Sequence, residues 1–594
     1  MKLAAAIAAV LFAPAVAAAE PIVHTDTHEV RACAPLADGA LVGTGGGLVR
    51  VDGKGAQRAV WTASDGLPGT RIETIVRDGD GWWIGTDGGG ARVRLGGDEL
   101  TPAIAIDRSV ASAAMHDVVR HGGALYAATW NGVVKLGARG KGTPVPWKGA
   151  ARGPRVHVAA LASSGGSLWA GTAAGLFVLR GGRLEAVALE GAHASAGVTS
   201  LHADGDGLWI ATSDGLFVRD ARGVRRIGGS ELTHVTTVEG AIVVAGLGTG
   251  LEQVDRGRLI AFAGAPHGLA LAQTVSEHDG AACAGGLDGL WLRPRASTAW
   301  TEAPHQAGLP SNDISALAVD HRRLWVGTFD RGLAVSDNGG GFRTIAHPDL
   351  DGRINALLVE PRAGKPSRLW VATAAGLMML DGPDVKDVAR LTRRDGLPGR
   401  GVLSLARLRD GRVIAGTSTG AVIVSDGRPM PVGPAGTDIG NVWAVGEDAD
   451  GMLWLGTTTG VWRGPSTVEG KVDRGAAWKR MSVATGHLDD DWVMAIAPRG
   501  RAVWVGGYKG GVVRFDLDDL KGTRLGGGWV NPGGLRWEGE TLYASTQEGL
   551  RSGDGASATW KTEAGLPGKD VTAMVRIADA HWVATRRGLV YLTR

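Results

Sequence analysis

The sequence predicts an all-β protein built from short repeated units, and three observations lead to this prediction. Glycine supplies 96 of the 594 residues and tryptophan 21. One phrase recurs along the whole chain, and no stretch shows convincing helical periodicity. Short apolar segments separated by glycine turns are typical of antiparallel strands. The glycines follow no three-residue period, which excludes a collagen helix.

The recurring phrase is an apolar residue, Trp, an apolar residue, Gly or Ala, Thr, a short polar insert, Gly and an apolar run. Its fourteen copies have a mean spacing of about 42 residues, which together with four expected strands is typical of a β-propeller blade. Clear copies begin at Trp82, Leu168, Leu208, Leu324, Leu369, Leu453, Val503 and His581, and weaker ones near Leu41, Leu125, Ile242, Ala281, Val413 and Leu542.

Fourteen blades exceed the usual number in one ring, so the sequence predicts two seven-bladed β-propellers in tandem. We expect residues 20–300 to form the first and residues 301–594 the second. The orphan N-terminal strand, Ile22–Thr25, is expected to complete blade seven, and Thr298–Thr301 to complete blade fourteen, since closure removes unpaired edges. Alternatively, Thr298–Thr301 finishes blade seven and the N-terminal strand pairs elsewhere.

The first 19 residues have the pattern of an export leader. Lys2 is followed by an apolar run too short to span a membrane comfortably, and Ala17–Ala19 fits a cleavage site after Ala19. We therefore expect a periplasmic or secreted protein without a membrane span after removal of the leader.

Composition excludes several classes of function. Lys plus Arg is 63 and Asp plus Glu is 60, so the net charge of +3 does not favour a nucleic-acid partner. The only two cysteines, Cys33 and Cys283, rule out a cysteine-rich zinc domain. Aligning the repeats places them in blades one and seven, which become neighbours in a closed ring. Export permits a disulfide between them; the alternative is two buried free thiols.

A second phrase precedes several of the tryptophan strands. It reads Gly-Leu-Pro, apolar strand, Asp-Gly, Leu-Trp-x-Gly-Thr and Gly-Leu, and copies begin at Ser64, Ala307, Arg394 and Glu563. This order resembles the two-component regulator propeller repeat. That family forms paired seven-bladed propellers outside bacterial sensor kinases and often recognises carbohydrate fragments. The resemblance covers nearly all of residues 30–594 and implies the propeller pair without the kinase part.

Two further patterns are interpreted as structural. The Asp-x-Asp-Gly segments near Asp78, Asp204 and Asp448 lack the Glu that a calcium loop requires, so we interpret them as tight turns. The periodic tryptophans are expected to pack between blades.

Aromatic and charged residues outside the repeat pattern form the candidate binding site, at one mouth of the second propeller. Aromatic faces beside charged groups suit ligands such as sugars, although solvated loop decoration is the alternative. We expect the second propeller to hold the main contact because its loops between the second and third strands are bulkier than those of the first. The candidates are Phe329, Asp330, Arg331, Trp443, Asp490, Asp491, Trp492, Tyr508, Lys509, Arg586 and Arg587.

The motifs of common hydrolases and phosphate-binding loops are missing from the sequence, and no cofactor or metal is expected. The favoured function is therefore an exported, non-catalytic protein that binds a glycan fragment or another protein, for instance a separate signalling protein. A carbohydrate-active hydrolase or lyase is an alternative, suggested by the acidic run Asp489–Asp491 beside Trp492. A structural or assembly protein of the cell envelope is the third hypothesis.

Overall fold

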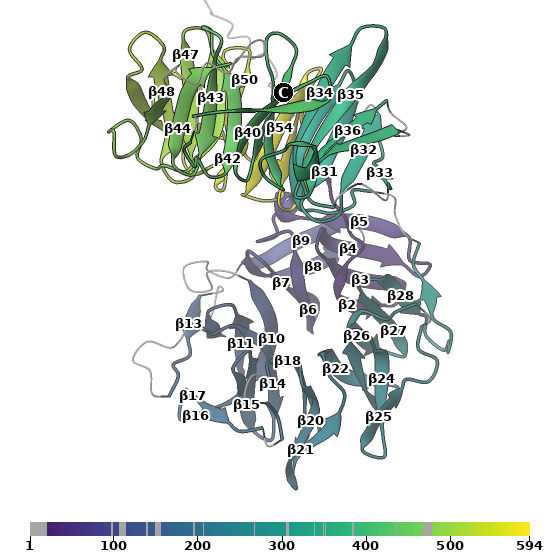
Figure 1. Ribbon diagram of the computed structural model, residues 1–594. Helices are drawn as coiled ribbons and strands as arrows, with labels where there is room; N and C mark the ends of the chain where they lie inside the picture. Colours follow the sequence, from purple (N-terminus) through teal and green to yellow (C-terminus); the bar gives the residue numbers. More distant parts are fainter. Residues whose placement is uncertain are drawn as a thin grey trace, which may run out of the picture.

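The computed structural model describes residues 21–593, apart from 97–98, 106–113, 138–140, 149–155, 190, 194–195, 206, 267, 305–307, 338, 348–349, 351, 383–384, 386, 435 and 467–477. In this part of the chain the strands form fourteen four-stranded sheets, the blades, which we number one to fourteen in chain order (Figure 1). Short 3-10 turns occur at Ala63–Asp65 and Arg393–Asp395. The predicted all-β fold is confirmed.

The first seven blades form a closed ring. Their innermost strands contact one another in chain order, and the last returns to the first. These strands are β2 (Val30–Leu36), β6 (Ile72–Asp78), β10 (Met115–His121), β14 (Val158–Ser164), β18 (Val198–Asp204), β22 (Leu232–Val238) and β26 (Ala272–His278).

The remaining seven blades close in the same way, which confirms the prediction of two seven-bladed propellers. Figure 1 shows this second ring, green to yellow, above the first. Its innermost strands are β30 (Ile314–Asp320), β34 (Ile354–Arg362), β38 (Val402–Arg407), β42 (Val442–Glu447), β46 (Val493–Arg499), β50 (Val530–Glu538) and β54 (Val571–Ile577).

The repeated Gly-Thr pair explains how blades turn and pack. In blade eleven, β43 (Met452–Thr457) and β44 (Gly460–Pro465) are joined by a tight turn. Thr457 Oγ1 donates to the carbonyl of Gly460 (2.8 Å) and accepts from the amide of Thr459 (3.0 Å). A Cβ on Gly456 would lie 2.6 Å from Val493 Cγ1 of the next blade. Glycine therefore permits the close approach of neighbouring blades.

The core lies between adjacent blades, and most of the repeat tryptophans are buried in it. Trp325 and Val335 of blade eight, for example, pack in one cluster with Leu369 and Val371 of blade nine. Trp209 is the half-buried exception. The periodic tryptophans thus form packing between blades, as the sequence predicts, and are not available to stack on a ligand.

The expected pairing of the two closing strands is wrong, and the alternative holds. β1 (Ile22–His24) pairs with β56 (Gly588–Thr593), so it completes blade fourteen. β29 (Thr301–Glu302) pairs with β28 (Gly289–Arg293) and completes blade seven locally. The reason is connectivity: blade fourteen lacks a fourth strand of its own, whereas blade seven finds one directly downstream. The expected boundary at 300/301 therefore shifts, since Ile22–His24 lies in the second ring and Thr301–Glu302 in the first.

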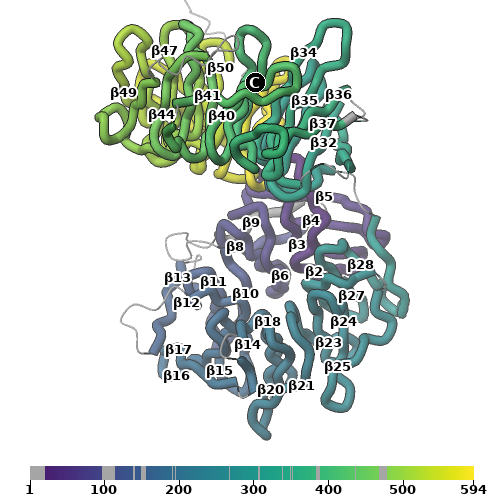
Figure 2. Tube along the Cα trace, in the orientation of Figure 1, coloured from purple at the N-terminus to yellow at the C-terminus, as the bar shows by residue number. Residues whose placement is uncertain are grey.

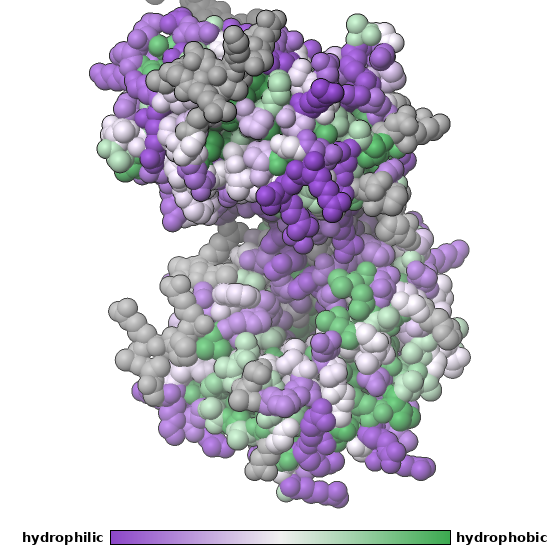
Figure 3. All heavy atoms as spheres, viewed as in Figure 1, coloured by the Kyte–Doolittle hydropathy of each residue, from purple (hydrophilic) through white to green (hydrophobic). Residues whose placement is uncertain are grey.

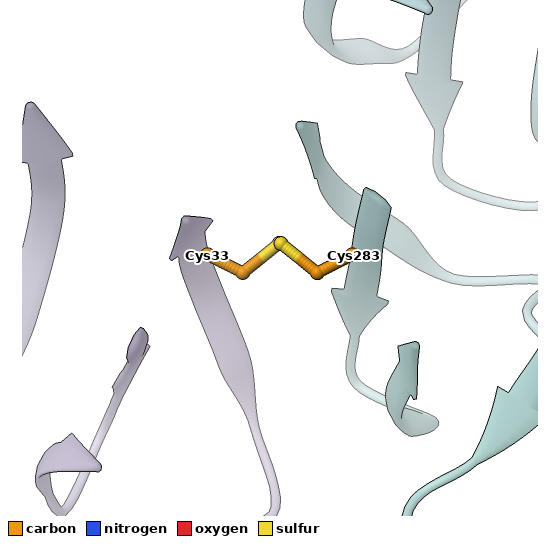
Figure 4. The surroundings of a disulfide bond; sticks show 2 residues. All are labelled: Cys33 and Cys283. Atoms are coloured by element: carbon orange, nitrogen blue, oxygen red, sulfur yellow. A yellow bond between two sulfur atoms is a disulfide. The ribbon is translucent and has the colours of Figure 1, made fainter. Parts of the chain in front are cut away.

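A disulfide joins Cys33 and Cys283 (Figure 4). Cys33 lies in β2 of blade one and Cys283 in β27 (Ala281–Gly286) of blade seven, with 6.2 Å between their Cα atoms. The bond connects positions 250 residues apart across the seam of the first ring. Both cysteines are buried among apolar side chains that include Val30, Val42 and Leu290.

The two rings meet through polar loops of blades two and fourteen. Thr70 Oγ1 donates to the carbonyl of Pro567 (2.6 Å), and Ser64 Oγ donates to the carbonyl of Gly565 (3.1 Å). Figures 1 and 2 show that this junction is narrow, and Figure 3 shows hydrophilic residues gathered where the two bodies approach. The rings are separate hydrophobic bodies joined by a polar contact.

The predicted leader, residues 1–19 with cleavage after Ala19, lies outside the described residues. No helix within the described ranges is long and apolar enough to cross a membrane.

Candidate functional site

One face of the second propeller, which we call the mouth, is built from two kinds of loop. One kind leads into each innermost strand, and the other joins the second and third strands of a blade. Among the latter are the loops between β31 (Arg323–Thr328) and β32 (Leu333–Asp337), between β47 (Ala502–Gly507) and β48 (Gly511–Asp516), and between β55 (Ala580–Thr585) and β56. These three carry most of the predicted site residues.

Three aromatic rings form a continuous cluster at the mouth, over blades twelve and thirteen. The centroids of Trp492 and Tyr508 are 5.6 Å apart, and those of Tyr508 and Trp529 are 5.8 Å apart. The Nζ of Lys509 lies 5.5 Å from the centroid of the Trp529 ring, a cation–π geometry. Trp492 is 49% exposed and Trp529 40% exposed. We call Trp492, Tyr508, Lys509 and Trp529 the aromatic cluster.

The acidic run before Trp492 fixes the loops that carry the cluster. Asp490 accepts from the amides of Trp492 (3.1 Å) and Lys509 (2.7 Å), so one carboxylate ties the two cluster loops together. Asp491 Oδ1 accepts from the amide of Val483 (2.7 Å). Asp489 forms an ion pair with Arg524 (2.8 Å). All three carboxylates thus have partners within the protein, which gives them a positioning role.

A second group lies at the mouth where blade fourteen meets blade eight. The guanidinium of Arg586 lies 3.8 Å from the centroid of Phe329 and 2.8 Å from Asp313 Oδ1, and its Nε lies 3.6 Å from Asp570 Oδ2. Burial raises the pKa of the Asp313 carboxyl despite the opposing charge of Arg586. We call Asp313, Phe329, Asp570 and Arg586 the arginine group.

Asn531 connects this group to the aromatic cluster. Its Nδ2 donates to Asp570 Oδ1 (2.7 Å), and Asn531 stands two residues after Trp529. The described contacts therefore join Phe329, Arg586, Asp570 and Asn531, and the chain itself leads from Asn531 back to Trp529 of the aromatic cluster. Most of the predicted residues contribute to this arc on blades eight, fourteen, thirteen and twelve.

Four predicted residues have other placements. Asp330 and Arg331 are exposed in the loop after β31, and the side chain of Arg331 has no hydrogen bond or ion pair with any described residue. Trp443 lies on the wall of the central channel. Arg587 Nε lies 2.5 Å from Asp87 Oδ2, which belongs to the loop between β7 (Gly81–Thr86) and β8 (Gly89–Gly96) of the first propeller. Arg587 is therefore a contact between the rings.

Trp529, Asn531, Asp313 and Asp570 belong to this candidate site but are not among the residues predicted from the sequence. Trp492, Trp529, Asp313 and Asp570 occupy one position, directly before the first residue of an innermost strand. A comparison of this single position in all fourteen repeats would have found them. Asn531 lies two residues after this position in blade thirteen. In that blade the repeat tryptophan is replaced by Tyr543. No group of three or more His, Cys, Asp or Glu side chains is placed to hold a metal ion within the described ranges.

Comparison with known proteins supports the repeat and the fold. Residues 308–330 match the model of the two component regulator propeller, which confirms the predicted resemblance at the first repeat of the second ring. A search of curated proteins finds no match.

Several solved structures share the architecture at low identity. PorZ, a bacterial surface component of the type-IX secretion system of Porphyromonas gingivalis, aligns with a TM-score of 0.68 and 14% identity over 97% of this chain and 87% of its own. An ancestral GH74 enzyme aligns with a TM-score of 0.69 and 12% identity over 98% of this chain and 99% of its own. A GH74 enzyme of Niastella koreensis aligns with a TM-score of 0.59 and 13% identity over 96% of this chain and 99% of its own. At these identities the likeness establishes the fold alone.

Proposed function

We propose that this chain is an exported, non-catalytic recognition protein that binds a glycan fragment at the mouth of its second propeller. The observation that carries the proposal is the aromatic cluster, because exposed tryptophans held in place by buried or paired groups can stack on the C–H faces of sugar rings. Asp490 holds the two cluster loops together before any ligand arrives. Such preorganisation lowers the entropy lost on binding.

The arginine group supplies polar partners beside these stacking faces. Arg586 and Asp570 of this group are partly exposed charged side chains, and the neighbouring loop adds the exposed Arg331, whose guanidinium has no partner among the described residues. Sugars present hydroxyl groups that both donate and accept hydrogen bonds, so a lining of carboxylate and guanidinium groups suits them. Location in the periplasm or outside the cell, after cleavage of the leader, completes this proposal.

The test is a thermal-shift screen of oligosaccharides followed by titration calorimetry with the best ligand. A ligand that binds only the folded state raises its stability. Replacing Trp492 or Trp529 by Ala should weaken binding by about 1–3 kcal/mol, as loss of a binding anchor does. Trp130→Ala is the matched control, because Trp130 is an exposed tryptophan of the first ring. If the Trp492 and Trp529 variants fold and bind the ligand like the parent, the mouth is excluded as the binding site.

A carbohydrate-active hydrolase is the second candidate function, and Asp313 is the observation in its favour. Its carboxyl has a raised pKa and lies in the same group as Asp570, and a general acid needs such a raised pKa. Release of reducing ends from a polysaccharide, lost in Asp313→Asn, would establish this function and overturn the non-catalytic proposal. Capture of a protein partner by the mouth, with no response to any sugar, would instead favour a role in envelope assembly or signalling.

A further inference from the structure

The central channel of the second propeller contains a cavity of about 450 Å³. Residues from all seven innermost strands line it. The volume lies in the range of pockets that hold small molecules. Apolar side chains such as Leu357, Leu405, Ile496 and Val575 form much of the wall between the two ends of the channel.

At the mouth end, Trp443 lines the cavity. The pairing of β42 with β43 shifts register between Val442 and Ala444, and this bulge leaves Trp443 unpaired on the channel wall. Bulges re-aim side chains in this way. The indole Nε1 of Trp443 is buried and has no hydrogen-bond partner among the described residues. A buried N–H without an acceptor is unfavourable, and a ligand atom can supply that acceptor.

At the opposite end, three arginines and one glutamate line the cavity. Arg536 pairs with Glu538 (2.6 Å), and Arg409 Nη1 donates to the carbonyl of Ala449 (2.9 Å). Glu447 accepts from the backbone amide of Arg409 (2.7 Å). Arg407 is exposed and has no hydrogen bond or ion pair with any part of the chain that the structure describes. The lining charge is therefore positive, with one unpaired guanidinium.

We infer that this channel is a second binding site, for an elongated organic anion with a carboxylate at one end, an apolar body and a hydrogen-bond acceptor at the other end. The carboxylate would pair with Arg407, and the distal acceptor would meet Trp443 Nε1. Arg407 aligns with Glu447, four residues beyond Trp443, so the two ends are about 10–13 Å apart along the strand. This site is independent of the aromatic cluster.

Three probes of equal chain length separate the contributions of the two ends. Suberate carries a carboxylate at each end, octanoate at one end only, and 1,8-octanediol carries no charge. Titration calorimetry should give suberate the highest affinity. Octanoate should bind about tenfold more weakly because it lacks the distal acceptor, and octanediol at least tenfold more weakly because it lacks the charge. Equal binding of octanediol and suberate, or no binding of suberate at millimolar concentration, would overturn the inference.

Substitutions at each end of the channel test which residue binds each end of the ligand. Arg407→Gln should weaken suberate at least tenfold, whereas Arg412→Gln, which removes a nearby arginine that pairs with Asp410 and lies outside the cavity lining, should leave the affinity for suberate unchanged. Trp443→Phe removes only the N–H and part of the ring, so suberate should bind severalfold more weakly while the melting temperature of the free protein stays the same or rises. Equal affinities for the Arg407 and Arg412 variants would contradict the site. Failure of this test leaves the oligosaccharide test at Trp492 unaffected, since ligand and residues differ.

Discussion

At the scale of single residues, the turn between first and second strands does more than reverse the chain. Asp448, in the Asp-x-Asp-Gly segment of blade eleven, accepts from the amides of Asp450 (2.9 Å) and Met452 (3.0 Å), as a tight-turn residue does. Its Oδ2 also accepts from Trp454 Nε1 (2.7 Å) and Arg463 Nε (2.6 Å). The turn thereby satisfies the buried indole N–H of the repeat tryptophan.

Replacing Asp448 by Ala should therefore be strongly destabilising. Asp448 is fully buried, and its removal leaves the Nε–H of Arg463, the indole N–H of Trp454 and two amides without this acceptor, while Arg463 Nη2 keeps its ion pair with Asp450 (2.9 Å). Loss of one partner of a buried ion pair typically costs about 3–5 kcal/mol. Asp410→Ala is the matched control: it lies in the corresponding turn of blade ten but is exposed and paired with Arg412 at the surface, so its loss should cost about 1 kcal/mol or less. Chemical denaturation of both variants measures the difference; equal losses would refute the argument.

At the scale of elements, the two rings close by different means. The second ring places strand β1 from the start of the chain beside β56 from its end. The first ring builds blades one and seven from local strands, so its seam depends on packing between β2 and β26 and on the disulfide. The covalent bond thus takes the place of a shared blade.

Reduction of the disulfide should selectively weaken the first ring. A disulfide typically contributes about 2–4 kcal/mol by restricting the unfolded chain. Hydrogen exchange of the native protein, with and without a reductant, should show faster exchange in β2 and β26 and no change in β38 or β42. The Cys33→Ala, Cys283→Ala double variant should behave like the reduced protein. Equal loss of protection in both rings, or none in either, would contradict this account.

At the scale of the whole molecule, the repeat period predicted the blades and both rings, because each blade carries the same Trp and Gly-Thr pattern. It did not predict the closing strands. A segment of two or three residues, such as Thr301–Glu302 or Ile22–His24, carries too little pattern to choose a partner. Nor did it place Arg587, whose pairing with Asp87 depends on how the rings dock. Contacts within a repeat follow from periodicity, whereas contacts between the ends and between the rings do not.

The first ring contains a set of half-buried histidines that makes it sensitive to acid. Burial lowers the pKa of His116 and His234 to about 4, and it also lowers the pKa of His157 and His202. Each neutral imidazole therefore contributes stability above its unfolded pKa near 6.5, and this contribution is lost as the pH falls towards 4. Asp117 acts in the opposite direction. Burial raises the pKa of its carboxyl to about 6, so its contribution to folding stability is lost as the pH rises through 6.

Four histidines with lowered pKa values oppose one aspartate with a raised pKa. The first ring should therefore lose stability as the pH falls from 6.5 to 4. In the second ring, His24 packs against the rings of Trp582 and Phe342, and its burial there also lowers its pKa. Hydrogen exchange at pH 7.5 and pH 5.0, corrected for intrinsic rates, should show protection falling more in β10, β18 and β22 than in β38, β42 and β46. His234→Asn should be less stable at pH 7.5 and lose less on acidification, since one titrating group is gone. The same pH dependence in both rings, or in the variant and the parent, would show that these half-buried imidazoles do not control it.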